Sequence, residues 1–169
     1  MVVMSSPVKT EMNVLLIDNP QRLFSCSRLL PELRKNLSSE QVFCMAAHDS
    51  FCGLQLCRAF EMDLVVVAVR QSELLRTMIL QIEQEFPGVV VLVVGKDGDR
   101  VAVDDVLRET GSRWIAMQSE GEVSPSMEIE RRVREIRAEK LKIGQELSKQ
   151  AQGVGSRVLI RLNATHMTS

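Results

Sequence analysis

The chain has 169 residues, of which 45% are hydrophobic and 25% are charged, and its formal net charge is -1. This composition is typical of a globular protein, and the nearly balanced charge gives no reason to expect nucleic acid or an anionic membrane as a partner. No apolar run is long enough to cross a bilayer. The first dozen residues lack the apolar core of a secretory signal, so we expect a cytoplasmic protein.

The cysteines and histidines give little support to a metal site. The two histidines, His48 and His166, are far apart in the sequence, and no Cys-x-x-Cys pair occurs. A structural zinc site would need such ligand spacing. We therefore predict no metal and no cofactor, and we expect the cysteines to be buried, reduced thiols. They are Cys26, Cys44, Cys52 and Cys57.

Short apolar runs alternate with helix-like stretches along most of the chain. The run Met62–Val69 has no polar alternation, which is typical of a strand covered by helices on both faces of a parallel sheet. The repeating pattern predicts an α/β fold with a doubly wound, five-stranded parallel sheet. The expected strands are Met12–Ile17, Gln41–Ala47, Met62–Val69, Val89–Gly95 and a weaker edge strand, Arg113–Met117.

Two of the intervening helices carry specific expectations. Pro31 interrupts the apolar face of the first, where we expect a kink or an early end, because an interior proline removes a backbone hydrogen bond. His48, Asp49 and Ser50 supply a turn and a cap for the second helix. Its expected buried stripe is Phe51, Leu54, Cys57 and Phe60.

The last third of the chain has a different character. The segment Met127–Gln150 is rich in Glu, Arg, Lys and Leu, and it predicts a long helix with a heptad pattern. The run Arg157–Leu162 is typical of a short strand. We expect a loose arm (1–11), a sheet domain (12–125), the last helix with its heptad extension (126–152) and a tail (153–169). The heptad positions are Ile129, Val133, Ile136, Lys140, Ile143, Leu147 and Gln150.

The segments Val14–Asn19 and Asp63–Ala68, set among alternating strands and helices, resemble the receiver domain of two-component response regulators. The resemblance covers roughly residues 12–130 and implies the strand order 2-1-3-4-5 of a receiver or flavodoxin-like fold. In that family an acidic pair after strand one holds magnesium, and an aspartate ending strand three accepts phosphate. A hydroxyl residue ends strand four and a lysine ends strand five.

The residues that carry phosphotransfer in that family are mostly replaced here. An alanine at the acceptor position cannot form an acyl phosphate, and one aspartate beside an amide is a poor magnesium site. Loss of the lysine removes the charge that would pair with a phosphoryl group. The resemblance therefore implies a pseudo-receiver with no catalytic residues, and not an enzyme. The positions are Asp18, Asn19, Ala68, Val94 (or Val93, given a one-residue ambiguity in register) and Gln118.

The first functional hypothesis is a phosphorylation-independent regulatory domain in signal transduction. It would bind a protein partner or a second copy through the last helix. Lys140 would weaken a homodimer and favour a partner with an acid opposite. The same apolar stripe would also arise if the helix packs on its own sheet. The residues expected to carry the interaction are Ile129, Val133, Ile136, Ile143 and Leu147.

Three alternatives stay open. The chain could be the N-terminal regulatory fragment of a larger signalling enzyme. It could also be a small-ligand-binding, flavodoxin-like domain, although no Gly-x-Gly-x-x-Gly follows the first strand and tyrosine is absent. The third alternative keeps phosphorylation through another acceptor, Asp63 or Asp97. Asp63 precedes its apolar run, which is the wrong end of the strand for that role.

Overall fold

The computed structural model describes residues 11–17, 26–68, 72–116 and 124–165. Five parallel strands form one sheet in the order β2-β1-β3-β4-β5, which confirms the doubly wound topology. The strands are β1 (Met12–Ile17), β2 (Val42–Ala47), β3 (Leu64–Ala68), β4 (Val90–Gly95) and β5 (Arg113–Ala116). The helices are α1 (Cys26–Asn36), α2 (Ser50–Ala59), α3 (Ser72–Glu85), α4 (Arg100–Glu109) and α5 (Pro125–Thr165), with short 3-10 turns η1 (Ser38–Glu40) and η2 (Asp97–Asp99).

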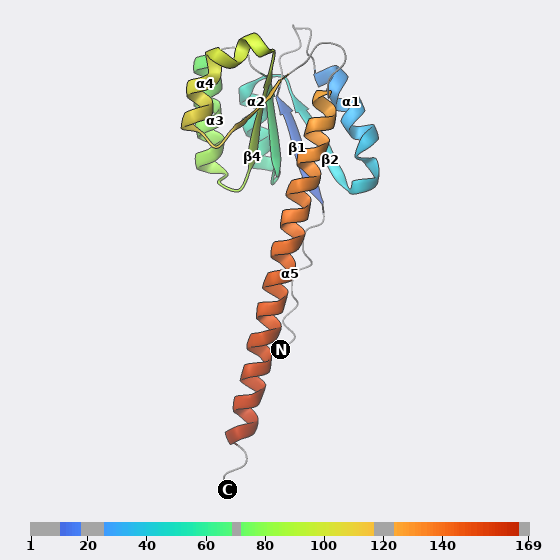
Figure 1. Ribbon diagram of the computed structural model, residues 1–169, viewed down its shortest axis with the longest axis vertical. Helices are drawn as coiled ribbons and strands as arrows, with labels where there is room; N and C mark the ends of the chain where they lie inside the picture. Colours follow the sequence, from blue (N-terminus) through green and yellow to red (C-terminus); the bar gives the residue numbers. More distant parts are fainter. Residues whose placement is uncertain (1–10, 18–25, 69–71, 117–123, 166–169) are drawn as a thin grey trace. The chain divides into compact units, whose positions relative to one another are not determined.

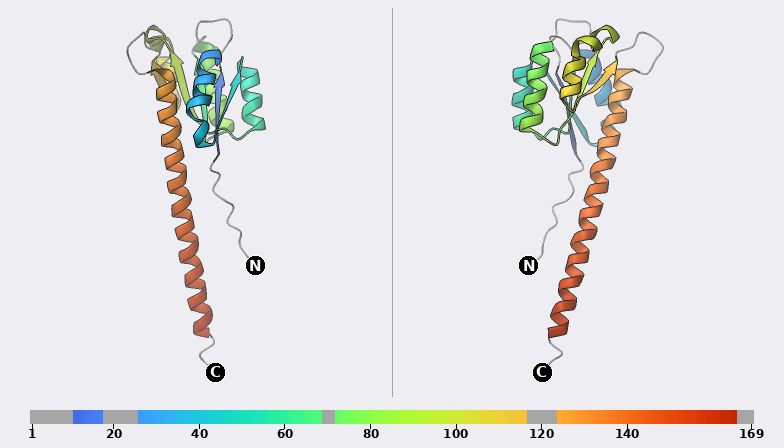
Figure 2. Two further views of the ribbon diagram at one scale, coloured as in Figure 1. Left: turned by 90° about the vertical axis from the view of Figure 1, so that its right-hand side faces the viewer. Right: turned by 60° about the vertical axis from the view of Figure 1, so that its left-hand side comes forward.

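Helices cover both faces of the sheet (Figure 1 and Figure 2). One face packs against α2, α3 and α4, and its buried cluster takes alternate strand residues such as Leu15, Val65 and Val93. Successive strand residues point to opposite faces. The buried residues between them, such as Leu64 and Leu92, therefore face the opposite layer, which holds α1 and the first turns of α5.

The predicted buried stripe of α2 is wrong at both phenylalanines. Phe51 is 70% exposed and Phe60 is 49% exposed. The buried residues of the helix are Gly53 and Cys57. Gly53 approaches β1 so closely that an added Cβ would lie 2.5 Å from Cδ1 of Ile17. The close approach of Gly53 to β1 determines which side of α2 faces the core. The spacing of the large apolar residues does not reveal this side of the helix.

Helix α1 continues through Pro31 to Asn36, so the prediction of an early end is wrong. Leu33 and Leu37 lie beyond the proline and are fully buried, and this packing outweighs the lost backbone hydrogen bond. The guanidinium of Arg34 donates two hydrogen bonds, of 3.0 and 3.2 Å, to the carbonyl oxygen of Cys44. A side chain of α1 thus satisfies a backbone carbonyl group of β2, which is an edge strand of the sheet.

Helix α5 is a single helix of 41 residues, and the strand expected at Arg157–Leu162 is wrong because that backbone is helical. Lengthening an existing helix avoids the cost of nucleation, so a short apolar run can continue it. The chain divides into two compact units, and α5 contributes 125–134 to the sheet unit, Glu11–Arg134, and the remainder to the other. None of the described helices is both long enough and apolar enough to cross a membrane.

An ion pair on the surface of the sheet unit makes stability depend on pH. Arg58 of α2 donates two hydrogen bonds to the carboxylate of Glu85 on α3, at 2.9 and 3.0 Å, and Gln81 donates a third. The hydrogen bonds from Arg58 and then Gln81 lower the pKa of Glu85 from its usual 4.5 to about 2. The carboxylate therefore contributes stability above pH 4.5, and this contribution is lost as pH falls toward 2.

We expect Glu85→Gln to flatten the acid side of the stability profile. The melting temperature of the wild-type chain should fall more steeply than that of the variant between pH 4.5 and pH 2, because only the wild type takes up this proton on unfolding. Thermal melts followed by circular dichroism at several pH values measure the difference. Glu32→Gln, at an exposed position of α1, is the control. Parallel profiles for the wild type and Glu85→Gln would contradict the assignment.

Candidate functional site

The carboxyl edge of the sheet is the place where doubly wound folds carry their chemistry. In this chain the described strand ends at that edge are apolar or lack a side chain. Ala68 ends β3 and lies beside Val94 of β4, which in turn lies beside Ile115 of β5. Val94 and Ile115 are buried, while Ala68 is partly exposed. The register therefore identifies Val94, and not Val93, as the neighbour of the residue at the acceptor position.

Ala68 decides what this edge can do chemically. Formation of an acyl phosphate requires a carboxylate oxygen that attacks phosphorus, and the methyl group of alanine has no lone pair to offer. The neighbouring Val94 supplies no hydroxyl that could hydrogen-bond a phosphoryl oxygen. The middle of the edge therefore presents two hydrocarbon side chains. Asp18, Asn19 and Gln118, the other predicted positions of the pocket, lie outside the described residues.

Two carboxylates close to this edge accept hydrogen bonds from backbone N–H groups of nearby residues. Asp49 follows β2 and caps α2 as predicted, because its carboxylate accepts a 2.7 Å hydrogen bond from the backbone N–H of Cys52. This bond holds the pKa of Asp49 below its usual value. Asp99 follows β4, and its carboxylate accepts a 3.0 Å hydrogen bond from the backbone N–H of Lys96. Both carboxylates thus stabilise the turns that leave the sheet.

No group of three or more His, Cys, Asp and Glu side chains that could hold a metal ion occurs among the described residues. His48 lies exposed in the turn before α2. The side chain of Asp97 is not described. The structure thus assembles no set of hard oxygen ligands from the described part of the carboxyl edge.

Asp63 lies at the opposite end of the sheet from Ala68. It is 3% exposed and precedes β3, and its carboxylate accepts a 2.8 Å hydrogen bond from the backbone N–H of Asn13. Ala68 lies five positions further along the extended chain, which corresponds to roughly 16 Å. The backbone N–H of Asp63 also donates to the carbonyl oxygen of Asn13 at 2.9 Å. Asp63 therefore fastens β3 to β1 and is remote from the edge where phosphotransfer would occur.

The five residues predicted to carry an interaction on the last helix fall into two groups. Ile129 and Val133 are fully buried and Ile136 is 5% exposed, so these three are covered within a single chain. Ile143 is 57% exposed and Leu147 is 60% exposed. Helical periodicity alone gave one continuous stripe. In the structure only the second part of the stripe is exposed.

A polar cluster, which the sequence did not reveal, anchors the start of α5. Glu130 is 7% exposed and accepts a 2.7 Å hydrogen bond from the side-chain amide of Asn36 on α1. Arg134 donates from Nε to Glu40 of η1 at 2.9 Å and lies 3.8 Å from Glu130. The cluster therefore ties the root of α5 to α1 and to the turn that follows it. Its only signal in the sequence is the opposite charge of Glu130 and Arg134, four residues apart.

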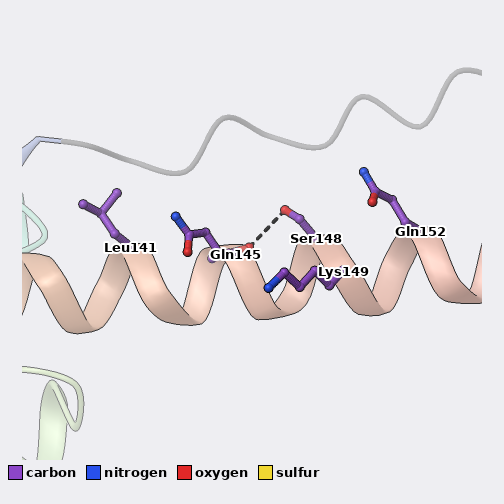
Figure 3. A pocket seen from close by; sticks show the side chains of 6 residues that line it. Leu141, Gln145, Ser148, Lys149 and Gln152 are labelled. Carbon is purple, nitrogen blue, oxygen red and sulfur yellow. Dashed lines mark hydrogen bonds between the residues drawn. The ribbon is translucent and has the colours of Figure 1, made fainter.

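A shallow pocket of about 300 Å³ lies on the second part of α5 (Figure 3). The lining residues that the structure describes all belong to this one helix. The lining residues are Leu141, Gly144, Gln145, Ser148, Lys149 and Gln152.

Solved structures with the same architecture have been determined from several bacteria. The signal receiver domain of an HD domain-containing protein from Pseudomonas fluorescens Pf-5 matches with a TM-score of 0.59 and 21% identity, over 78% of this chain and 98% of that chain. A response regulator from Thermotoga maritima matches with a TM-score of 0.58 and 20% identity, over 76% of this chain and 98% of that chain. The chain has the receiver fold.

A third similar structure is described as adenylate cyclase from Rhodopirellula baltica. It matches with a TM-score of 0.59 and 16% identity, over 82% of this chain and 98% of that chain. No protein-family model and no curated protein sequence matches the chain. At these identities the similarity concerns the receiver fold, and function has to be argued from the residues of the site.

Proposed function

We propose that this chain is a receiver-like regulatory domain that acts without phosphorylation, through protein contacts made by α5. The observation that carries the first part is Ala68, which stands beside Val94 where the receiver fold places its phosphoacceptor. Neither side chain can bind or transfer a phosphoryl group. The domain therefore has no catalytic step of its own, and it works by binding.

The second part of the proposal is supported by the exposed portion of α5. Large aliphatic side chains on a solvent-facing helix favour association, because association removes their apolar surface from water. Ile143 and Leu147 are such side chains, and they lie four residues apart on one side of the helix. The polar cluster of Asn36, Glu130 and Arg134 fixes the root of the same helix to the sheet unit. We propose that α5 acts as the interaction arm of the domain.

We expect no phosphorylation by a small phosphodonor. Incubation with acetyl phosphate and Mg²⁺ should leave the intact mass unchanged, because the chain offers alanine in place of the nucleophile. Intact-mass spectrometry checks this result. A receiver domain that retains its acceptor aspartate, treated in parallel, shows that the donor is active. An added phosphoryl mass would contradict the proposal, and peptide mapping would then distinguish Asp18, Asp63 and Asp97 as acceptors.

A regulatory part of a larger signalling enzyme is a second candidate. It is favoured by the HD domain-containing protein and the adenylate cyclase among the similar structures. Reading the transcript beyond Ser169 tests it. A reading frame that continues into a catalytic domain would support this candidate, and a stop codon directly after Ser169 would contradict it.

A further inference from the structure

We infer that the occupant of the exposed part of α5 is a second copy of this chain, aligned in parallel and in register. This inference rests on the proposed function, because it names the partner for the same helix. The contact surface is defined by four residues that recur at steps of three and four and lie along one side of the helix. We call it the α5 seam, and it consists of Lys140, Ile143, Leu147 and Gln150.

The apolar part of the α5 seam has the pattern of a coiled coil. Ile143 and Leu147 are 57% and 60% exposed, and Lys140 and Gln150 are exposed on either side of them. In heptad terms Lys140 and Leu147 take the a position, and Ile143 and Gln150 take the d position. The pocket residues around Leu141 and Ser148 lie roughly on the other side of the helix. The seam and the pocket are therefore separate surfaces.

The charged residues at the α5 seam of one chain are complementary to those of a second copy. Glu139 directly precedes Lys140, so it takes the g position, and both side chains are exposed. In a parallel pair in register, a side chain at a lies beside the g residue that precedes the corresponding a position of the other helix. Lys140 of each chain would therefore lie beside Glu139 of the other. Two-fold symmetry makes this pair twice, so the chain itself supplies an acid opposite Lys140.

The polar positions of the α5 seam fix the register. In the in-register pair, Ile143 meets Ile143 and Leu147 meets Leu147, while the Lys140 and Gln150 layers lie at either side. A shift by one heptad would place Gln150 against Ile143, and the side-chain amide would lose hydrogen bonds to water without replacement. Polar residues at core positions commonly specify register in this way, at some expense of stability.

The antiparallel arrangement is disfavoured by a different acid. If two α5 helices ran in opposite directions with Ile143 against Leu147, the g positions would face each other near the centre of the contact. Glu146, which is exposed and takes a g position, would then lie against Glu146 of the other chain. Like charges that face each other destabilise an association. In the parallel pair the like charges that meet are those of Lys140, and Glu139 of each chain lies beside the opposite Lys140 and offsets their repulsion.

A charge exchange on the whole chain tests the inference. Glu139→Lys alone and Lys140→Glu alone should each weaken self-association roughly tenfold, because two attractive pairs become repulsive in each homodimer. An equimolar mixture of the two variants should regain wild-type association, because lysines then face glutamates at both positions. Glu146→Lys makes the same charge change on the same helix, and it should leave the dissociation constant nearly unchanged. Sedimentation equilibrium of each variant and of the mixture measures these constants.

Each possible result of these measurements either supports or contradicts the parallel dimer. Weakened single variants together with a restored mixture support a parallel second copy. A wild-type chain that stays monomeric at every concentration overturns the inference, and it leaves the proposed function to a partner of another sequence. Association that is strengthened by Glu146→Gln, which removes the like-charge contact of the antiparallel pair, and that is indifferent to Glu139→Lys overturns the parallel arrangement. The proposed function fails separately, if association survives polar substitution of Ile143 and Leu147.

Discussion

Replacing Ile129 with alanine will lower the free energy of unfolding of the sheet unit by about 2–5 kcal/mol, because it removes buried methyl groups and leaves a cavity. The same substitution at Ile143 will change that free energy by less than about 0.5 kcal/mol, since an exposed side chain loses little. Both residues are isoleucines of one helix and of one heptad pattern. They differ in exposure, which is 0% at Ile129 and 57% at Ile143.

Urea unfolding of the two variants measures the contrast. Trp114 is the only tryptophan, and it packs against the core cluster of the sheet, so its fluorescence reports the unfolding of that unit. The protein is kept dilute, so that any loss of association at Ile143 does not enter the comparison. Equal losses of stability in the two variants would show that Ile143 is also part of the folded core, and would remove it from the interaction surface.

The strands and their order could be predicted because each buried strand is a nearly unbroken apolar run. The predicted strand Met12–Ile17 agrees with the observed β1, and the strands predicted for β2, β3 and β4 begin one or two residues before the observed ones. The side of α2 that packs inward could not be predicted in the same way. It is set by Gly53, and a missing side chain gives no hydrophobic signal.

The candidate site could be predicted only for residues whose place in the sheet follows directly from their place along a strand. Ala68 ends β3 as expected, and Asp63 lies at the other end of that strand as expected, since both follow from one apolar run. The division of the heptad pattern was not predictable. A stripe that packs on its own sheet and a stripe that binds another molecule have the same spacing, so only burial separates Val133 from Leu147.

The helical tail shows a further limit of pattern analysis. The apolar run that begins at Val158 is compatible with strand and with helix, because short apolar runs do not distinguish the two. Its actual state depends on the long helix that precedes it, from which it continues without a new nucleus. Gly153 and Gly155 each cost a helix about 1 kcal/mol relative to alanine, yet they do not end α5.

Replacing Ile143 and Leu147 together with glutamine will have the largest effect on association. Burial of each such side chain contributes about 1.5–3 kcal/mol, and a symmetric dimer buries two copies of each. The double variant should therefore associate at least about a hundredfold more weakly than the wild type. Leu141→Gln is the matched control, since Leu141 is an exposed aliphatic residue of the same helix that lies away from the α5 seam.

The central claim is an interaction through the α5 seam that needs no phosphorylation. Light scattering after size exclusion, at a low and a high concentration and with or without acetyl phosphate and Mg²⁺, tests it most directly. We expect the mass of a dimer for the wild type and for Leu141→Gln, unchanged by acetyl phosphate, and the mass of a monomer for the Ile143→Gln and Leu147→Gln double variant. A double variant that keeps the dimer mass, or a wild type that dimerises only with acetyl phosphate, would contradict the claim.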